Sequence, residues 1–239
     1  MSHLILVRHG QSEWNLEKKF TGWVDVDLTS IGKLEACKAG EYIREQNLNI
    51  DYFYSSFQLR AINTLKLIKD TLRDKKEPIR AWQLNERHYG ALTGLSKDEM
   101  KKKLGENMIH QFRRSWDIKP DPLSKNNPYH PLNIDIYKEI PREKIPDTES
   151  LKDTYKRVME YYNSNIQKKL IEDKNVLIVA HGNSIRTLCK FLFKLDNDKI
   201  SLLEIPTGNP LFIKLNADQK IVECKYLDKD RAKDLLFSC

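Results

Sequence analysis

The feature that most constrains this chain is a short apolar run that ends in His-Gly and leads into a helix, because it occurs twice. Residues 4–7 are apolar and continue into Arg8 and His9. Residues 176–180 are apolar and continue into His181. Runs of this length that are apolar on both faces are typical of buried strands in a parallel sheet. Ligands bind at the carboxyl ends of such strands, so we expect both histidines to face one crevice.

Helical patterns separate the strand candidates. Apolar residues at helical spacing predict helices at residues 29–43, 61–72, 151–170 and 185–192. The first is capped by Thr29 or Ser30, with Ile31, Leu34, Cys37 and Ile43 on its apolar face. Further β-rich runs predict strands at residues 50–56, 202–206, 211–215 and 221–227. This alternation predicts an α/β fold, a three-layer sandwich with a mostly parallel central sheet flanked by helices.

The chain has 239 residues, 40% of them hydrophobic, and no linker rich in Pro, Gly or Ser divides it. We therefore expect one catalytic domain over residues 1–239. Residues 94–145 differ from the rest, since Lys, Asn and Pro dominate and no long strand pattern appears. This segment is expected to be a lid-like excursion of short helices and loops.

Composition limits the partners. Lys and Arg number 41 against 34 Asp and Glu, a net charge of +7 that suits an anionic partner or simply a Lys-rich surface. No RNA-binding aromatic strand, helix-turn-helix or zinc spacing favours nucleic acid. No leader or apolar stretch of about 18 residues is found, which predicts a cytoplasmic protein off the membrane. The cysteines, Cys37, Cys189, Cys224 and Cys239, form no C-x-x-C pair and are expected to be reduced thiols.

The residue types at the two strand ends point to phosphoryl transfer. A histidine with a pKa near ~6.5 has a large free-base fraction near neutrality and can act as nucleophile or proton shuttle. Arginine stays charged and matches phosphate oxygens. Arg60 falls near the start of a helix, where a cation opposes the helix dipole and a bound anion would explain it. A metal site is disfavoured, because the arginines would repel a cation and no H-x-x-x-H or acidic cluster is present.

Each residue also has a purely structural interpretation. A single histidine at a strand end is more often structural than catalytic, and Trp23 and Tyr89 are by type packing residues. The motifs weigh against this reading when they are taken together. "LVRHGQSEWN", "FTGWVDVDLT", "RAINTL", "LNERHYGALTG", "FRRSW", "TESL", "AHGNSIR" and "IPTGNPL" resemble the 2,3-bisphosphoglycerate-dependent phosphoglycerate mutases, within the histidine phosphatase superfamily. The resemblance extends from residue 3 to about residue 226.

The resemblance implies a function and a set of site residues. The family interconverts 3-phosphoglycerate and 2-phosphoglycerate in glycolysis, with 2,3-bisphosphoglycerate as primer and no metal. His9 would be the phosphorylated residue, Arg8, Arg60 and His181 would hold the phosphoryl group, and Glu86 would move the proton. The matching substrate contacts are Asn15, Thr21, Gly22, Tyr89, Lys97, Arg113, Arg114, Gly182 and Asn183.

Alternatives remain at this point. A phosphatase or a bisphosphoglycerate mutase would use the same fold, and a non-catalytic binder of phosphorylated ligands belongs to another class. The set His9, Glu86 and His181 argues against the binder, which needs no proton shuttle. The family also implies a homo-oligomer, for which we favour a dimer. Residues 121–144 and the tail after Leu227 are the segments expected to close over the site.

Overall fold

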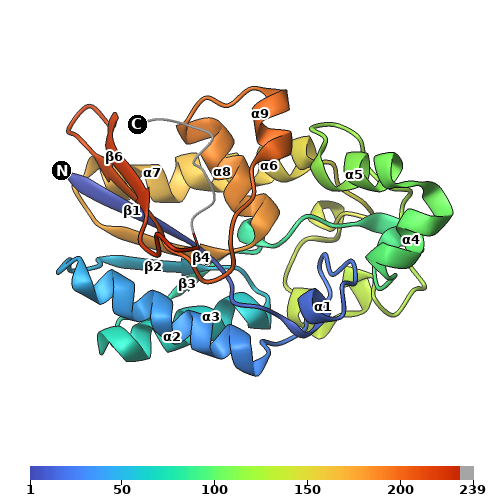
Figure 1. Cartoon of the computed structure of the whole chain (residues 1–239), viewed down its shortest axis with the longest axis horizontal. Helices are drawn as coiled ribbons and strands as arrows, with labels where there is room; N and C mark the ends of the chain where they lie inside the picture. Colours follow the sequence, from blue (N-terminus) through green and yellow to red (C-terminus); the bar gives the residue numbers. More distant parts are fainter. Residues whose placement is uncertain (232–239) are drawn as a thin grey trace.

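The computed structural model describes residues 1–231, and its centre is one six-stranded sheet (Figure 1). The predicted thiol Cys239 and the end of the tail lie outside the described residues. The strands are β1 (Ser2–Arg8), β2 (Tyr52–Ser55), β3 (Ile79–Arg80), β4 (Val176–Ala180), β5 (Leu211–Leu215) and β6 (Ile221–Tyr226). Their order across the sheet is β3-β2-β4-β1-β5-β6.

The sheet is mostly parallel, as predicted. The pairs β3–β2, β2–β4 and β4–β1 are parallel, and only β5 runs against its neighbours β1 and β6. The strand predicted at residues 202–206 is wrong. Its first residue ends helix α9 (Asn197–Leu202), and the rest is irregular chain. The two-residue strand β3 is too short to leave a pattern in the sequence.

Helices cover both faces of the sheet, which confirms the three layers (Figure 1). On one face lie α2 (Ser30–Glu45) and α3 (Leu59–Leu72), and on the other α6 (Leu151–Tyr161) and α8 (Gly182–Leu192). Alternate residues of β1 serve the two layers: Leu4 and Leu6 pack toward α6 and α8, while Ile5 and Val7 pack toward α2 and α3. A strand buried on both sides must be apolar throughout, which explains the unbroken run at residues 4–7.

Helix α2 exists as predicted, and Thr29 caps it by accepting a hydrogen bond from the Gly32 amide. The predicted apolar face is wrong at Ile31 and Leu34, which are 53% and 70% exposed, and right at Ile43, which is buried. The buried face consists instead of small residues with one isoleucine, namely Gly32, Ala36, Ala39, Gly40 and Ile43. Small side chains let α2 approach α3 closely. A Cβ added at Gly40 would lie 2.6 Å from the Cβ of Thr71.

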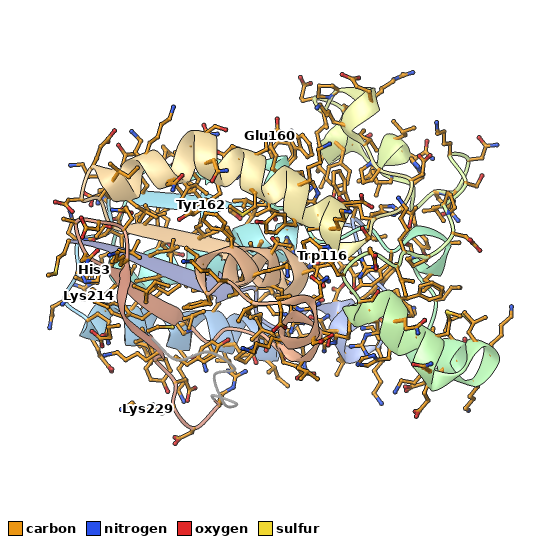
Figure 2. All side chains as sticks on the ribbon, turned by 90° about the horizontal axis from the view of Figure 1, so that it is seen from above. His3, Trp116, Glu160, Tyr162, Lys214 and Lys229 are labelled. Carbon is orange, nitrogen blue, oxygen red and sulfur yellow. The ribbon has the colours of Figure 1, made fainter. Side chains whose placement is uncertain are left out.

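The long stripe predicted at residues 151–170 is one continuous helical segment made of α6, a π-helical turn η6 (Tyr162–Ile166) and α7 (Gln167–Ile171). Figure 2 shows it from above, with Glu160 on its outer side. Tyr162, Ile166 and Leu170 are buried in the core beside the sheet. None of the helices within residues 1–231 is long and apolar enough to cross a membrane.

The excursion predicted at residues 94–145 contains two short helices, α4 (Lys97–Leu104) and α5 (Glu106–Arg114), and the 3-10 turns η3 (Pro131–Asn133), η4 (Asp135–Tyr137) and η5 (Arg142–Lys144). It lies beyond the carboxyl ends of the parallel strands, at the opposite end of the molecule from His3 and Lys214 (Figure 2). Tyr137 packs on Trp23 with ring centroids 4.9 Å apart and donates to its carbonyl at 2.5 Å. Trp23 is fully buried, which confirms its packing role.

Candidate active site

The two His-Gly strand ends meet because β1 and β4 are adjacent and in parallel register. Arg8 pairs with Ala180, so His9 and His181 follow at the same level. The His9 amide donates to the Ala180 carbonyl at 2.9 Å, and the two imidazole rings lie 5.0 Å apart between centroids. Both side chains are almost completely buried.

His9 has a defined tautomer. Its Nδ1 lies 2.7 Å from the Gly10 carbonyl oxygen, which can only accept, so Nδ1 carries the hydrogen and Nε2 keeps its lone pair. Burial, together with the charges of Arg60 and Arg8, holds the pKa of His9 well below its usual value. The ring is therefore a free base with an available Nε2, which is the state a nucleophile requires.

Gly10 lets the chain directly after His9 approach the start of α2 closely. A Cβ added at Gly10 would lie 2.1 Å from the carbonyl oxygen of Gly32, in the first turn of α2. The Gln11 carbonyl also accepts from the Thr29 amide at 2.9 Å. This backbone contact fixes the loop after β1 against α2 and so fixes the position of the His9 ring.

His181 contacts Ser56, whose hydroxyl lies 2.7 Å from its Nε2. The Ser56 hydroxyl also accepts from the Gln58 amide. When it donates to Nε2, the ring hydrogen is on Nδ1, and that buried atom has no partner in the described part of the chain. Burial and the nearby Arg60 hold the pKa of His181 well below its usual value. In that tautomer His181 offers an N–H without a partner next to His9; in the other, Nε2 donates to Ser56 and Nδ1 keeps a lone pair.

Two arginines flank the histidines. Arg8 donates from Nη1 to the Ile205 carbonyl at 2.8 Å, and its buried Nε has no partner among residues 1–231. Arg60, in the first turn of α3, donates to the carbonyls of Gly22 and Val24 at 2.9 Å each. Burial lowers the pKa of both guanidinium groups, which still remain charged. The position of Arg60 is therefore explained partly by the backbone it holds, and not only by an anion as the sequence argument assumes.

Glu86 lies in the loop before Arg87 and approaches the start of α8. Its Oε1 accepts from the amides of Arg87 at 2.7 Å and Asn183 at 3.2 Å. A Cβ added at Gly182 would be 3.8 Å from Glu86 Oε2 and 3.6 Å from Arg8 Nε. Both are ordinary van der Waals distances, so Gly182 lies against both the carboxylate and the guanidinium. A carboxyl group, a cation and a free-base histidine are thus assembled at one point.

The predicted substrate contacts come together in one cleft. Its lining contains every predicted site residue except His181, namely Arg8, His9, Asn15, Thr21, Gly22, Arg60, Glu86, Tyr89, Lys97, Arg113, Arg114, Gly182 and Asn183. His181 lies beneath this surface, against His9. The roles of the predicted site residues remain predictions, but the structure does bring these residues together.

The cleft is strongly cationic. Six of its lining side chains are Arg or Lys, and only Glu86 and Glu204 oppose them. Burial and the neighbouring Arg113 lower the pKa of Lys97 to about 8. Tyr89 faces the site rather than serving only as packing, since its hydroxyl accepts from Asn183 Nδ2 at 3.0 Å. Such a surface fits a small ligand with several negative charges.

Sequence reasoning missed three lining residues, Arg186, Glu204 and Ile205. Arg186 is one helical turn after Asn183 in α8 and donates to Asn183 Oδ1 at 2.9 Å. That spacing was visible in "AHGNSIR" and could have identified it. Ile205 contributes its carbonyl and Glu204 pairs with Arg114 at 2.9 Å, and neither contact leaves a sequence pattern. Within residues 1–231 no cluster of His, Cys, Asp or Glu could hold a metal ion.

The fold and the paired histidines define a class. A family model for the histidine phosphatase superfamily (branch 1) matches residues 4–226, and the chain belongs to that superfamily. Solved structures agree at the level of fold. A mycobacterial glucosyl-3-phosphoglycerate phosphatase has a TM-score of 0.69 at 21% identity, covering 94% of this chain and 97% of its own. An Entamoeba histolytica phosphoserine phosphatase has a TM-score of 0.66 at 19% identity, covering 95% and 98%.

Curated relatives define the family more narrowly. The 2,3-bisphosphoglycerate-dependent phosphoglycerate mutase of Pelagibacter ubique (strain HTCC1062) is 79% identical over 236 residues, covering 99% of each chain. The protein of the same name from Caulobacter sp. (strain K31) is 47% identical, covering 98% of each. The chain belongs to the family of 2,3-bisphosphoglycerate-dependent phosphoglycerate mutases, as its motifs predict.

Proposed function

We propose that this chain is a glycolytic phosphoglycerate mutase that interconverts 3-phosphoglycerate and 2-phosphoglycerate through a phosphohistidine at His9. The observation that carries the proposal is the free Nε2 of His9, next to His181 and Glu86 in a cationic cleft. The names of the relatives at 79% and 47% identity support the same reaction.

The site also suits 2,3-bisphosphoglycerate as the primer. Arg8 Nε and His181 Nδ1 are buried polar atoms that lack partners in the described residues, and both belong to side chains in contact with the His9 region. A phosphoryl group on His9 would accept a hydrogen bond from Arg8 Nε, and one from His181 Nδ1 in the tautomer that carries its hydrogen there. Arg113, Arg114 and Lys97 would attract the second phosphate and the carboxylate, because they line the same cleft.

The proposed transfer proceeds in two displacements. His9 Nε2 forms a bond to phosphorus as the bond from phosphorus to the substrate oxygen breaks, and Glu86 gives that oxygen a proton. In the second step the Glu86 carboxylate accepts the proton of the substrate hydroxyl, whose oxygen takes the phosphoryl group from His9. Arg8 and Arg60 stabilise the charge on the transferring group throughout.

The arginines supply the charge stabilisation that a divalent metal supplies in other phosphoryl-transfer sites. We therefore expect turnover to persist after EDTA treatment. A loss of activity in EDTA that Mg²⁺ or Mn²⁺ restores would contradict this part of the proposal.

The direct test measures conversion of 3-phosphoglycerate to 2-phosphoglycerate by ³¹P NMR, with and without added 2,3-bisphosphoglycerate. The proposal expects conversion that depends on the primer and is lost in His9→Ala. Release of inorganic phosphate as the main product would instead favour a phosphatase. Tight binding of phosphoglycerates with no reaction would favour a non-catalytic binder.

We further propose that the enzyme works in the cytoplasm, acts on small phosphoglycerates rather than on nucleic acids or membranes, and forms a homodimer. The cationic lining of the cleft suits a small acid, and the reaction belongs to glycolysis. Light scattering at working concentration tests the oligomeric state, and a monomer mass would contradict the dimer.

A further inference from the structure

We propose that Arg157 is a positioning residue for Glu86, acting through the backbone of the loop that carries it; the inference rests on the proposed function. Arg157 lies in α6, does not line the cleft and is 8% exposed. It would therefore influence the reaction without touching the substrate.

Every N–H of the Arg157 guanidinium has a partner. Nη1 donates to the carbonyls of Gln83 at 2.6 Å and Asn85 at 3.0 Å. Nη2 donates to the carbonyl of Glu86 at 3.0 Å and to Glu149 Oε2 at 2.9 Å. Nε donates to Glu149 Oε1 at 2.7 Å. Five donors thus meet five acceptors, three of them carbonyls at Glu86 or just before it.

Glu149 holds the chain on the other side of Glu86. Its Oε2 accepts from the His88 amide at 2.8 Å, and its carbonyl accepts from Arg87 Nε at 2.8 Å. The Glu149 amide in turn donates to the His88 carbonyl at 3.0 Å. Arg157 and Glu149 together fix the backbone before and after Glu86, so their buried ion pair holds this loop in place.

The loop needs side-chain partners for its backbone because it belongs to no sheet or α-helix. The 3-10 turn η1 (Trp82–Leu84) ends before Glu86, and the segment up to Tyr89 is irregular. Its carbonyls cannot be paired by regular structure, and a buried carbonyl without a partner is costly. Only the planar fork of arginine reaches several carbonyls and a carboxylate at once; lysine offers a single ammonium.

The test replaces Arg157 by Lys and measures mutase kcat. The number of active sites is taken as the number that 2,3-bisphosphoglycerate phosphorylates at equilibrium, so that misfolded protein does not lower the measured kcat. We expect kcat to fall by about tenfold to a hundredfold, as for a displaced proton-transfer group. KM for 3-phosphoglycerate should change less than about twofold, since Arg157 holds none of the cations that line the cleft.

A second background separates positioning from general structural damage. In Glu86→Gln the group that Arg157 positions no longer transfers a proton, so adding Arg157→Lys should reduce kcat by less than about threefold. The matched control is Thr154→Ala, in the same helix, whose hydroxyl donates to the Ser150 carbonyl. It should lower Tm but keep kcat per site within about twofold.

The outcomes distinguish this inference from the proposed function. A wild-type chain without mutase turnover would remove the proposed function. If the wild type is active and Arg157→Lys leaves kcat unchanged, or lowers kcat equally in the wild-type and Glu86→Gln backgrounds, the positioning role alone is overturned. If Arg157→Lys does not fold, Glu149→Gln takes its place, because it weakens the same pair, and it is judged by the same comparison with Glu86→Gln.

Discussion

Three buried histidines should make the stability of this protein fall steeply in mild acid. Burial and nearby arginines hold the pKa values of His9 and His181 well below their usual range, and burial lowers that of His88 to about 3. Above pH 7 these rings are neutral in both the folded and the unfolded chain. As the pH falls below the unfolded pKa of ~6.5, the unfolded chain takes up protons that the folded chain does not. Protonation therefore favours unfolding.

The size of the effect follows from this difference. At pH 5.5 each histidine that stays neutral in the fold costs about 1.4 kcal/mol, so three cost about 4 kcal/mol. That is a large share of the roughly 5–15 kcal/mol that stabilises a typical domain. Carboxylates with ordinary pKa values titrate at lower pH and contribute little in this window.

Urea unfolding at pH 7.0, 6.5, 6.0 and 5.5 measures the free energy directly. In His88→Gln the loss of unfolding free energy between pH 7.0 and 5.5 should shrink by about one third, since one of the three histidines that stay neutral in the fold is removed. His110→Gln removes an exposed histidine and is the matched control, with an unchanged loss expected. A free energy of unfolding that stays flat down to pH 5.5 would refute the reasoning.

Three further predictions concern the kinetics of the reaction. Glu86→Gln keeps the shape but cannot transfer a proton, so kcat should fall by about 10²-fold or more; near wild-type turnover would show that the proton moves by another route, such as His181. Arg186→Lys should raise KM for 3-phosphoglycerate about fivefold to tenfold, because Arg186 holds the carbonyls at the end of α5, including that of Arg113; an unchanged KM would argue against this. Truncation after Leu227 should raise the ratio of phosphate release to mutase turnover several-fold, about 1 kcal/mol in relative barriers. A constant ratio would leave water exclusion to the excursion alone.

Much of the fold could be predicted from local patterns. The apolar runs of β1 and β4 are unbroken because helices cover both faces of the sheet, and that burial is visible in the sequence. The face of α2 could not be predicted in the same way. Its contact with α3 uses Gly40 and alanines for close approach, and this leaves Ile31 and Leu34 in solvent. Apolar character alone does not reveal a helix that packs by small residues.

The candidate site divides along similar lines. The proximity of His9 and His181 could be predicted, because each follows a buried strand and parallel strands end at the same edge of a sheet. The pairing of Arg8 with Ala180 confirms it. Arg157 could not be found, since its role depends on carbonyls more than 70 residues away along the chain. Backbone acceptors are the same for every residue type, so a side chain that binds them leaves no pattern at the acceptor positions.

The central claim is that His9 is the nucleophile, and one labelling experiment tests it most directly. The protein is mixed with ³²P-labelled 2,3-bisphosphoglycerate, quenched in alkali and mapped by peptide. The predicted result is one phosphate per active site on His9 that is stable in base and lost in acid, and that is absent from His9→Ala. No label on the wild type, or a label that survives in His9→Ala, would contradict the account.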